Sequence, residues 1–136
     1  MKLYYTPGAC SLAVHITLCE TGLSFEKESV DLATKKTASG ADFSAINAKG
    51  YIPALQLDSG ELLTEGPAIN QYLADLVPEK KLAPANGTLD RVRVQSWLTF
   101  IGTELHKSFT PLFHPSSDDV KAQAKANIDK RLTYVN

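Results

Sequence analysis

The chain has 136 residues, of which 43% are hydrophobic and 21% are charged, and its formal net charge is −1. This size and composition allow a buried core, in one domain or two small ones. Basic residues are interspersed with acidic ones, which argues against a nucleic-acid-binding surface. Neither a signal sequence nor an apolar run long enough to span a bilayer is evident, so we expect a cytoplasmic protein without a membrane partner.

Cys10 is the most informative residue in chain order. It follows a short apolar strand predicted at residues 2–5 and a loop, and it precedes a helix predicted at 11–21, which Gly22 would end. The N-terminus of a helix has unpaired N–H groups and a partial positive charge, both of which favour a thiolate. We therefore expect the pKa of the Cys10 thiol to be lowered. The alternative is an inert thiol at a turn.

The second cysteine, Cys19, falls on the same helical pattern as Leu12 and Ile16, and we expect it to pack as a small hydrophobic residue. A helix between Cys10 and Cys19 would hold the two sulfur atoms too far apart for a disulfide. The three histidines are not spaced like metal ligands, so no metal site is expected.

The rest of the first half predicts a mixed sheet. A strand at 25–32 would pair in parallel with the first strand across the helix between them. The segment 35–47 predicts one short helix. Strands at 54–57 and 61–64 form a hairpin, and Gly66 and Pro67 open a further helix. The expected apolar face of that helix consists of Ala68, Ile69, Tyr72, Leu73, Leu76 and Val77.

A composition change at 78–87 marks a linker between domains predicted at 1–80 and 87–136. A long helix should begin at the N-cap Thr88 and end or kink at Pro111. Ser117 and the acidic residues after it predict a last helix that runs to the chain end.

Two dipeptides in the first domain suggest ligand contacts. Ile52-Pro53 precedes a strand, and a cis bond there would leave the backbone N–H and C=O of Ile52 free to pair with a peptide-like ligand. An ordinary trans proline at an edge strand is the alternative. Glu65-Gly66 opens a helix and is suited to a zwitterion, with Glu65 binding an ammonium and the amides a carboxylate. Simple compensation of the helix dipole is the alternative there.

In the second domain, Thr99, Thr103 and His106 recur at i, i+4 and i+7, which places them on one helix face. His106 could donate a hydrogen bond to a thiolate and keep it ionised. A surface histidine without such a role is the ordinary alternative.

Four segments together resemble the bacterial beta class of glutathione S-transferases, in the same order as in the family. They are Met1-Lys2-Leu3-Tyr4-Tyr5-Thr6-Pro7-Gly8-Ala9-Cys10-Ser11, Gly50-Tyr51-Ile52-Pro53-Ala54-Leu55, Leu63-Thr64-Glu65-Gly66-Pro67-Ala68-Ile69 and Thr103-Glu104-Leu105-His106-Lys107. The resemblance implies an α/β thioredoxin-like N-terminal domain with a mixed sheet, followed by an all-α C-terminal domain. Complete family members have further C-terminal helices, so the all-α domain is expected to be incomplete here.

The resemblance also implies a glutathione site with Pro53 cis. Glutathione would be a co-substrate rather than a bound cofactor, a small electrophile the second substrate, and the assembly a homodimer. The residues implied to bind glutathione are Cys10, Lys35, Ile52, Glu65, Gly66, Thr99, Thr103, Glu104 and His106. Cys10 and His106 are the implied catalytic residues. Thr99 stands where the class usually has asparagine.

Three functions therefore remain open. The first is a glutathione transferase with a detoxification role, in which the thiolate of glutathione attacks an electrophile. The second is a glutathione-dependent thiol–disulfide oxidoreductase in which Cys10 forms the mixed disulfide. The third is a non-catalytic glutathione-binding fragment.

Overall fold

The computed structural model describes all 136 residues and divides into two compact units, Met1–Ala85 and Asn86–Asn136. The sequence predicted domains at 1–80 and 87–136, and the short 3-10 helix η1 (Pro78–Lys80) lies in the predicted linker. No helix in the chain has the length and apolar character needed to cross a membrane.

The first unit is built on a five-stranded sheet with the order β3-β2-β1-β4-β5. Its strands are β1 (Lys2–Tyr5), β2 (Glu26–Asp31), β3 (Lys36–Thr37), β4 (Ala54–Gln56) and β5 (Leu62–Thr64). β1 pairs in parallel with β2 and antiparallel with β4, and β5 returns antiparallel beside β4. The predicted mixed sheet is confirmed. β3 was not predicted, because two residues are too few to show a period-two pattern.

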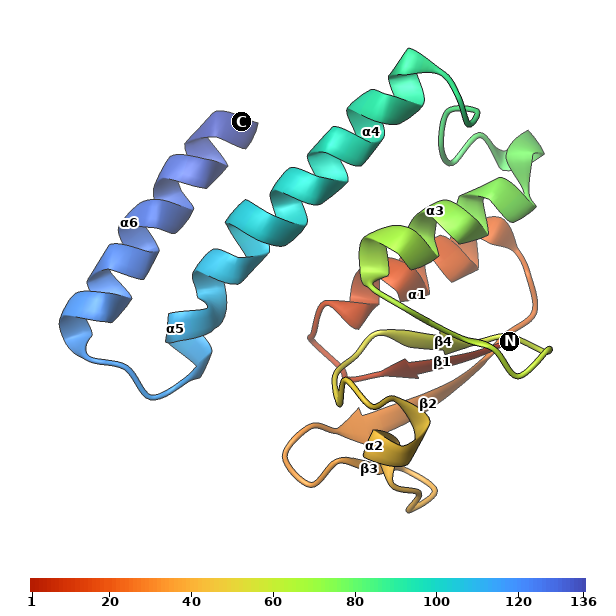
Figure 1. Ribbon diagram of the computed structural model, residues 1–136, viewed down its shortest axis with the longest axis horizontal. Coiled ribbons are helices and arrows are strands. Elements are labelled where there is room, and N and C mark those ends of the chain that lie inside the picture. Colours follow the sequence, from red (N-terminus) through yellow and green to blue (C-terminus); the bar gives the residue numbers. More distant parts are fainter. The chain divides into compact units, whose positions relative to one another are not determined.

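Helices cover both faces of this sheet. α1 (Ser11–Thr21) and α3 (Gly66–Leu76) lie on one face, and the short α2 (Phe43–Ile46) lies on the other (Figure 1). Successive residues of a strand point to opposite faces, so Leu3 packs toward α1 and α3 while Tyr4 packs against Phe43 of α2. The residues buried on the α1 and α3 side are Leu3, Val14, Leu18, Leu55, Ile69 and Leu73.

The sequence predicted the buried faces of α1 and α3 only in part. In α1, Val14 and Leu18 pack on the sheet, whereas Leu12 and Ile16 are more than half exposed. Cys19 is exposed as well, so the expectation that it packs as a hydrophobic residue is wrong. The reason is that α1 carries apolar residues on several sides, and spacing alone does not select the side that meets the sheet.

In α3, Ile69 and Leu73 are fully buried as expected, but Tyr72 and Leu76 are exposed. The buried stripe of α3 is therefore narrower than the sequence predicted. The predicted end of α1 is confirmed, because Gly22 adopts a left-handed φ of 71° and its N–H bonds to the carbonyl of Cys19.

The second unit begins with α4 (Leu89–Phe100), and Thr88 is its N-cap as predicted, with its side chain accepting the N–H of Arg91. The chain continues through a π-helix, η2 (Ile101–Leu105), and a 3-10 segment, η3 (His106–Phe109), into α5 (Thr110–Phe113). Pro111 lies in the first turn of α5, where proline is tolerated. The irregularity therefore begins at η2 and not at Pro111, which corrects the prediction.

Side-chain hydroxyl groups bond back to the backbone along this irregular stretch. Thr99, Thr103 and Ser108 each donate to the carbonyl oxygen four residues earlier. Such contacts compete with the helical ladder and bend helices. Gly102, a weak helix former, lies between the first two threonines.

The last helix, α6 (Asp118–Val135), has Ser117 as its N-cap, with the Ser117 side chain accepting the N–H of Val120 at 3.4 Å. This start agrees with the prediction. α6 contacts the preceding helices through Tyr134, whose ring lies 5.9 Å from that of Trp97 and 5.3 Å from that of Phe100. An ion pair of 2.7 Å between Arg131 and Glu104 also joins α6 to η2.

Glu28 anchors the edge of the sheet in the first unit. Its carboxylate accepts hydrogen bonds from the hydroxyl and the N–H of Ser39, and it lies 3.5 Å from the ammonium of Lys2. Hydrogen bonds from Ser39 and then Thr37 lower the pKa of Glu28 from its ordinary 4.5 to about 2. Glu28 therefore favours the folded state in its ionised form.

We expect this contribution to be complete above pH 4.5 and to be lost as the pH falls from 4.5 toward 2, because the unfolded carboxylate takes up its proton first. Glu28→Gln should lower the free energy of unfolding by about 1 kcal/mol at neutral pH. Urea unfolding followed by circular dichroism at several pH values measures this. Glu26→Gln, on the same strand and 79% exposed at its side chain, is the control. A deficit of Glu28→Gln that stays constant down to pH 2 would contradict the assignment.

Candidate functional site

Cys10 lies at the N-cap of α1, directly after the loop that leaves β1. Its Sγ donates a hydrogen bond to the backbone carbonyl of Ile52 at 3.5 Å. The hydroxyl of the neighbouring Ser11 is buried and makes two bonds of 3.2 Å to the backbone N–H and carbonyl of Thr6. Ser11 thus closes the loop, and Cys10 is the side chain that the loop presents.

Cys10 is exposed as a whole residue, but partial burial of its sulfur raises the pKa of the thiol above its ordinary value, while the backbone N–H groups of Cys10 and Ser11 act in the opposite direction. The expectation of a lowered pKa is therefore wrong. It counted the favourable helix N-terminus and left out the loss of solvent around the sulfur, which penalises the thiolate. At neutral pH Cys10 is a protonated thiol that donates to Ile52.

The segment before β4 is held in place by a buried amide. Asn47 donates from Nδ2 to the carbonyl of Tyr51 at 2.8 Å and accepts the N–H of Lys49 at 3.1 Å. The segment leads into Ile52 and Pro53, which are both buried, and their peptide bond is cis. Sequence reasoning missed Asn47, because its bonds close a local loop rather than form a motif.

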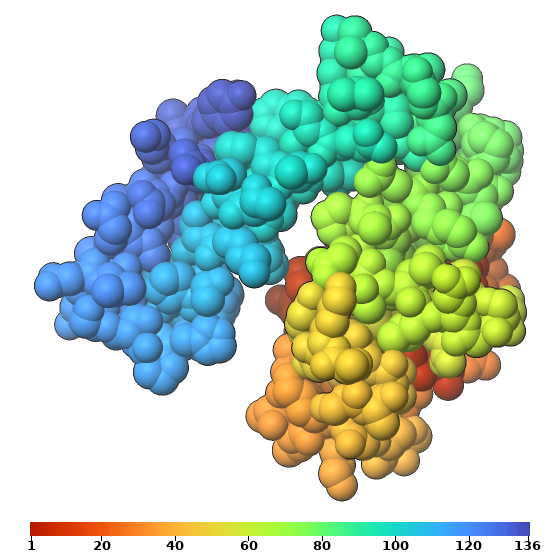
Figure 2. All heavy atoms as spheres, viewed as in Figure 1, coloured from red at the N-terminus to blue at the C-terminus, as the bar shows by residue number.

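Glu65 stands at the N-cap of α3 with a backbone φ of 68°, in the left-handed region that few residues other than glycine adopt. Its Oε1 accepts hydrogen bonds of 2.7 Å from both Lys49 Nζ and Tyr51 Oη. Gly66 follows as the first residue of α3 and lies against Pro53. In the space-filling view, the yellow segment before β4 adjoins the yellow-green start of α3 at the surface (Figure 2).

Lys35 lies near the same segment. It adopts a left-handed φ of 57°, and its Nζ donates to the carbonyl of Gly50 at 2.7 Å. The first unit therefore contains six of the residues that the sequence pointed to: two lie within the 47–53 segment, and each of the other four contacts it. The six are Cys10, Lys35, Ile52, Pro53, Glu65 and Gly66.

The other four predicted residues belong to the helical unit and are exposed: Thr99, Thr103, Glu104 and His106. The hydroxyls of Thr99 and Thr103 donate to backbone carbonyls within the helix. The carboxylate of Glu104 is paired with Arg131, which sequence reasoning did not find. The π-helix η2 changes the rotation per residue between Thr99 and His106, so the predicted single face is not that of a regular helix.

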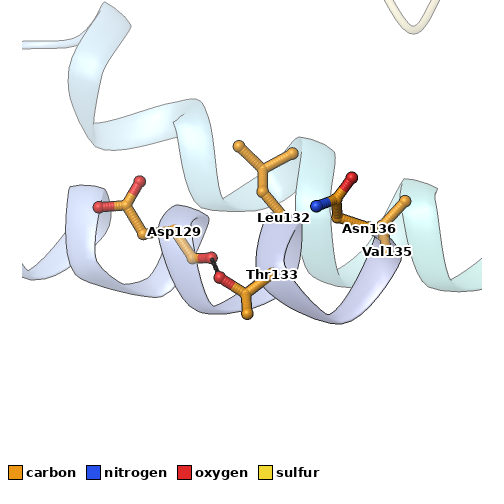
Figure 3. A pocket seen from close by; sticks show the side chains of 5 residues that line it. All are labelled: Asp129, Leu132, Thr133, Val135 and Asn136. Atoms are coloured by element: carbon orange, nitrogen blue, oxygen red, sulfur yellow. Dashed lines mark hydrogen bonds between the residues drawn. The ribbon is translucent and has the colours of Figure 1, made fainter.

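Two surface hollows lie away from these residues. One of about 560 Å³ is lined by the last turns of α6 (Figure 3). Its residues are Asp129, Leu132, Thr133, Val135 and Asn136. The other, of about 440 Å³, is lined by residues of β1 and β2 with Ala38 and Ser39. Neither contains a predicted site residue, and the chain has no cluster of metal-ligand side chains.

Similarity to known proteins identifies the family to which this chain belongs. Residues 8–76 match the family described as glutathione S-transferase, N-terminal domain. The chain is 53% identical over its whole length to glutathione S-transferase GstA of Escherichia coli O157:H7, and it covers 68% of that protein. The chain belongs to the glutathione S-transferase family. The predicted thioredoxin-like first domain followed by a helical region is confirmed.

Solved structures of this family agree with the class that the sequence suggested. The chain is similar to a sphingomonad glutathione S-transferase complexed with glutathione, at 54% identity and a TM-score of 0.96, covering 99% of this chain and 68% of that one. It is also similar to the beta-class glutathione S-transferase of Sphingomonas chungbukensis, at 53% identity and a TM-score of 0.96, with the same coverage. The chain spans about two thirds of the length of these relatives.

The environment of Cys10 predicts that its thiol reacts slowly with alkylating reagents at neutral pH. In a Cys19→Ala variant, the rate of alkylation by iodoacetamide should rise with pH along a titration curve whose midpoint lies above the ordinary value of 9.0. Mass spectrometry of the modified peptide over a pH series measures this midpoint. The Cys10→Ala variant, which retains the exposed Cys19, provides the comparison. A midpoint below 9.0 for Cys10 would contradict the assignment.

Proposed function

We propose that this chain binds glutathione and catalyses the attack of the glutathione thiolate on small electrophilic molecules. The observation that carries the proposal is the contact between Cys10 Sγ and the carbonyl of Ile52, at the point where α1 begins and β4 is about to start. It places a thiol beside a backbone segment that can pair with a peptide. The family membership and the relative complexed with glutathione support the choice of ligand.

Each part of the tripeptide has a matching group in the first unit. The backbone of Ile52 pairs with the cysteinyl residue in the proposed complex. Glu65 receives the ammonium of the γ-glutamyl group, and the N–H of Gly66 at the start of α3 receives its carboxylate. The ammonium of Lys35 receives the glycyl carboxylate.

In this proposal the nucleophile is the sulfur of glutathione and not that of Cys10. A protonated Cys10 can donate a hydrogen bond to the glutathione thiolate and so stabilise the anion. The raised pKa of Cys10 supports this role, because it keeps the proton on the donor. His106 is proposed as a second donor, and Thr99, Thr103 and Glu104 as further ligand contacts from the helical unit.

The same feature argues against the thiol–disulfide alternative. A cysteine that forms a mixed disulfide reacts as the thiolate, and its rate falls with the thiolate fraction. Burial reduces that fraction for Cys10 at neutral pH. The proposed setting is the cytoplasm, where conjugation would serve detoxification.

The test is retention of the full chain on immobilised glutathione, followed by conjugation of glutathione to 1-chloro-2,4-dinitrobenzene. Cys10→Ala should lower kcat/KM by no more than about tenfold, because it removes one hydrogen-bond donor. Cys19→Ala, which changes an exposed thiol on α1, should have no effect.

Complete loss of conjugation in Cys10→Ala, or a glutathione adduct on Cys10 with turnover of a disulfide substrate, would favour the covalent mechanism. Retention without conjugation by the wild type would favour the non-catalytic binding function.

We also propose that two copies of the chain pair. Large apolar side chains of the helical unit are exposed, namely Leu89, Val92, Trp97, Ile101, Phe113, Val120, Leu132, Tyr134 and Val135. Exposed apolar surface of this kind is typical of interaction sites. Sedimentation equilibrium should give twice the monomer mass of 14.8 kDa. A compact monomer with a sharp calorimetric melting transition would contradict this proposal.

A further inference from the structure

The Glu65 carboxylate accepts hydrogen bonds from two residues to which the resemblance gives no role. Lys49 Nζ and Tyr51 Oη both reach Glu65 Oε1, each at 2.7 Å. Lys49 Nζ also donates to the hydroxyl of Thr64 at 3.0 Å and lies 5.9 Å from the centre of the Tyr51 ring. The three side chains form one connected group at the surface of the first unit.

This group connects a loop to a helix start far along the chain. Lys49 and Tyr51 precede β4, whereas Glu65 follows β5, so the bonds span 16 and 14 residues. The loop end is itself fixed by Asn47, which bonds to the carbonyl of Tyr51 and the N–H of Lys49. The two donors are therefore presented from an ordered backbone.

Glu65 needs such support because its backbone lies in the left-handed region at φ 68°. A residue other than glycine in this region carries strain, which persists only where surrounding contacts determine the conformation. Its carbonyl accepts the N–H groups of Ala68 and Ile69, and these bonds fix the backbone alone. The bonds from Lys49 and Tyr51 fix the carboxylate.

We propose that Lys49 and Tyr51 are positioning residues for Glu65, which orient its carboxylate to receive the ammonium of the γ-glutamyl group of glutathione. This inference rests on the proposed glutathione site. It makes the selectivity for the γ-glutamyl amino group depend on two side chains outside the set that the resemblance implies.

The protonation states of the two donors agree with this role. The hydrogen bond to Glu65 raises the pKa of Lys49 and the pKa of Tyr51. Both groups therefore keep their protons at neutral pH and remain donors. Since Lys49 is an ammonium next to the place proposed for the ligand ammonium, a competing interpretation is that Lys49 occupies the position of the ligand. The two interpretations predict opposite changes in affinity.

The experiment measures the dissociation constants of two ligands by calorimetry on the full chain. One is glutathione, and the other is its analogue in which the γ-glutamyl amino group is replaced by hydrogen. Lys49→Met and Tyr51→Phe should each raise the dissociation constant of glutathione about five- to tenfold. This is the effect of losing one hydrogen bond to a charged group at an exposed site. Affinity for the analogue should change by less than about twofold, because it has no ammonium to place.

Three controls separate positioning from a merely structural effect. Lys49→Arg should restore most of the affinity for glutathione. In a Glu65→Gln background, Lys49→Met and Tyr51→Phe should have no further effect, since the group that they orient is gone. The matched variants Lys125→Met and Tyr72→Phe, on α6 and α3, should bind both ligands like the wild type.

If a variant loses affinity for both ligands equally, its residue has a structural role and the inference is overturned. Unchanged or tighter binding of glutathione by Lys49→Met and Tyr51→Phe would overturn it as well, and tighter binding would indicate that Lys49 competes with the ligand. Tyr51→Phe removes a single hydroxyl and keeps the ring, so it is the decisive variant if Lys49→Met does not fold. If the wild-type chain binds neither ligand, the proposed function itself is refuted. This result is obtained before any variant is measured, so the two failures are distinguishable.

Discussion

The pairing of β1 on both sides is the constraint on which the first unit depends. β1 pairs in parallel with β2 and antiparallel with β4, so the chain that leaves β1 toward Cys10 meets the chain that enters β4 through Ile52. The contact between Cys10 and Ile52 follows from this arrangement although 42 residues separate them. Leu3, fully buried at the centre of β1, fixes the strand against α1 and α3.

At Cys10 two general effects oppose each other. A helix N-terminus favours an anion by roughly half a positive charge spread over the first turn, while partial burial removes water that would solvate the anion. Burial has the larger effect on the pKa here. The protonated sulfur donates a hydrogen bond to the carbonyl of Ile52. The site thus offers a proton donor to an incoming thiolate rather than a second thiolate.

Local signals in the sequence were sufficient for most of the framework. Gly22, Thr88 and Ser117 act within one turn of the helix ends that they define, and their effect is visible in the order of residues alone. The course of the helix beyond Ile101 was not predictable in the same way. Three hydroxyl groups there bond back to carbonyls and Gly102 weakens the helix, whereas the apolar spacing still suggests a regular helix.

The site was predictable only in part for a related reason. Cys10, Ile52, Glu65 and Gly66 stand at element boundaries, which the sequence marks with proline, glycine or a change of period. Lys49 and Tyr51 carry no such mark, because an exposed lysine and tyrosine are ordinary loop residues until the fold brings Glu65 to them. The contact of Cys10 with Ile52 likewise joins residues distant in sequence.

The proposed ligand contacts in the first unit are divided between backbone and side chains, and this division decides where selectivity can reside. The backbone of Ile52 and the N–H of Gly66 can pair with any peptide or carboxylate of suitable shape, and no side-chain replacement removes them. Recognition of the γ-glutamyl amino group therefore depends on the carboxylate of Glu65. The Glu65 side chain is 55% exposed, so hydrogen bonds contribute much of what fixes the direction of its carboxylate. Lys49 and Tyr51 are two donors to it, and Asn47 holds the loop from which they reach it.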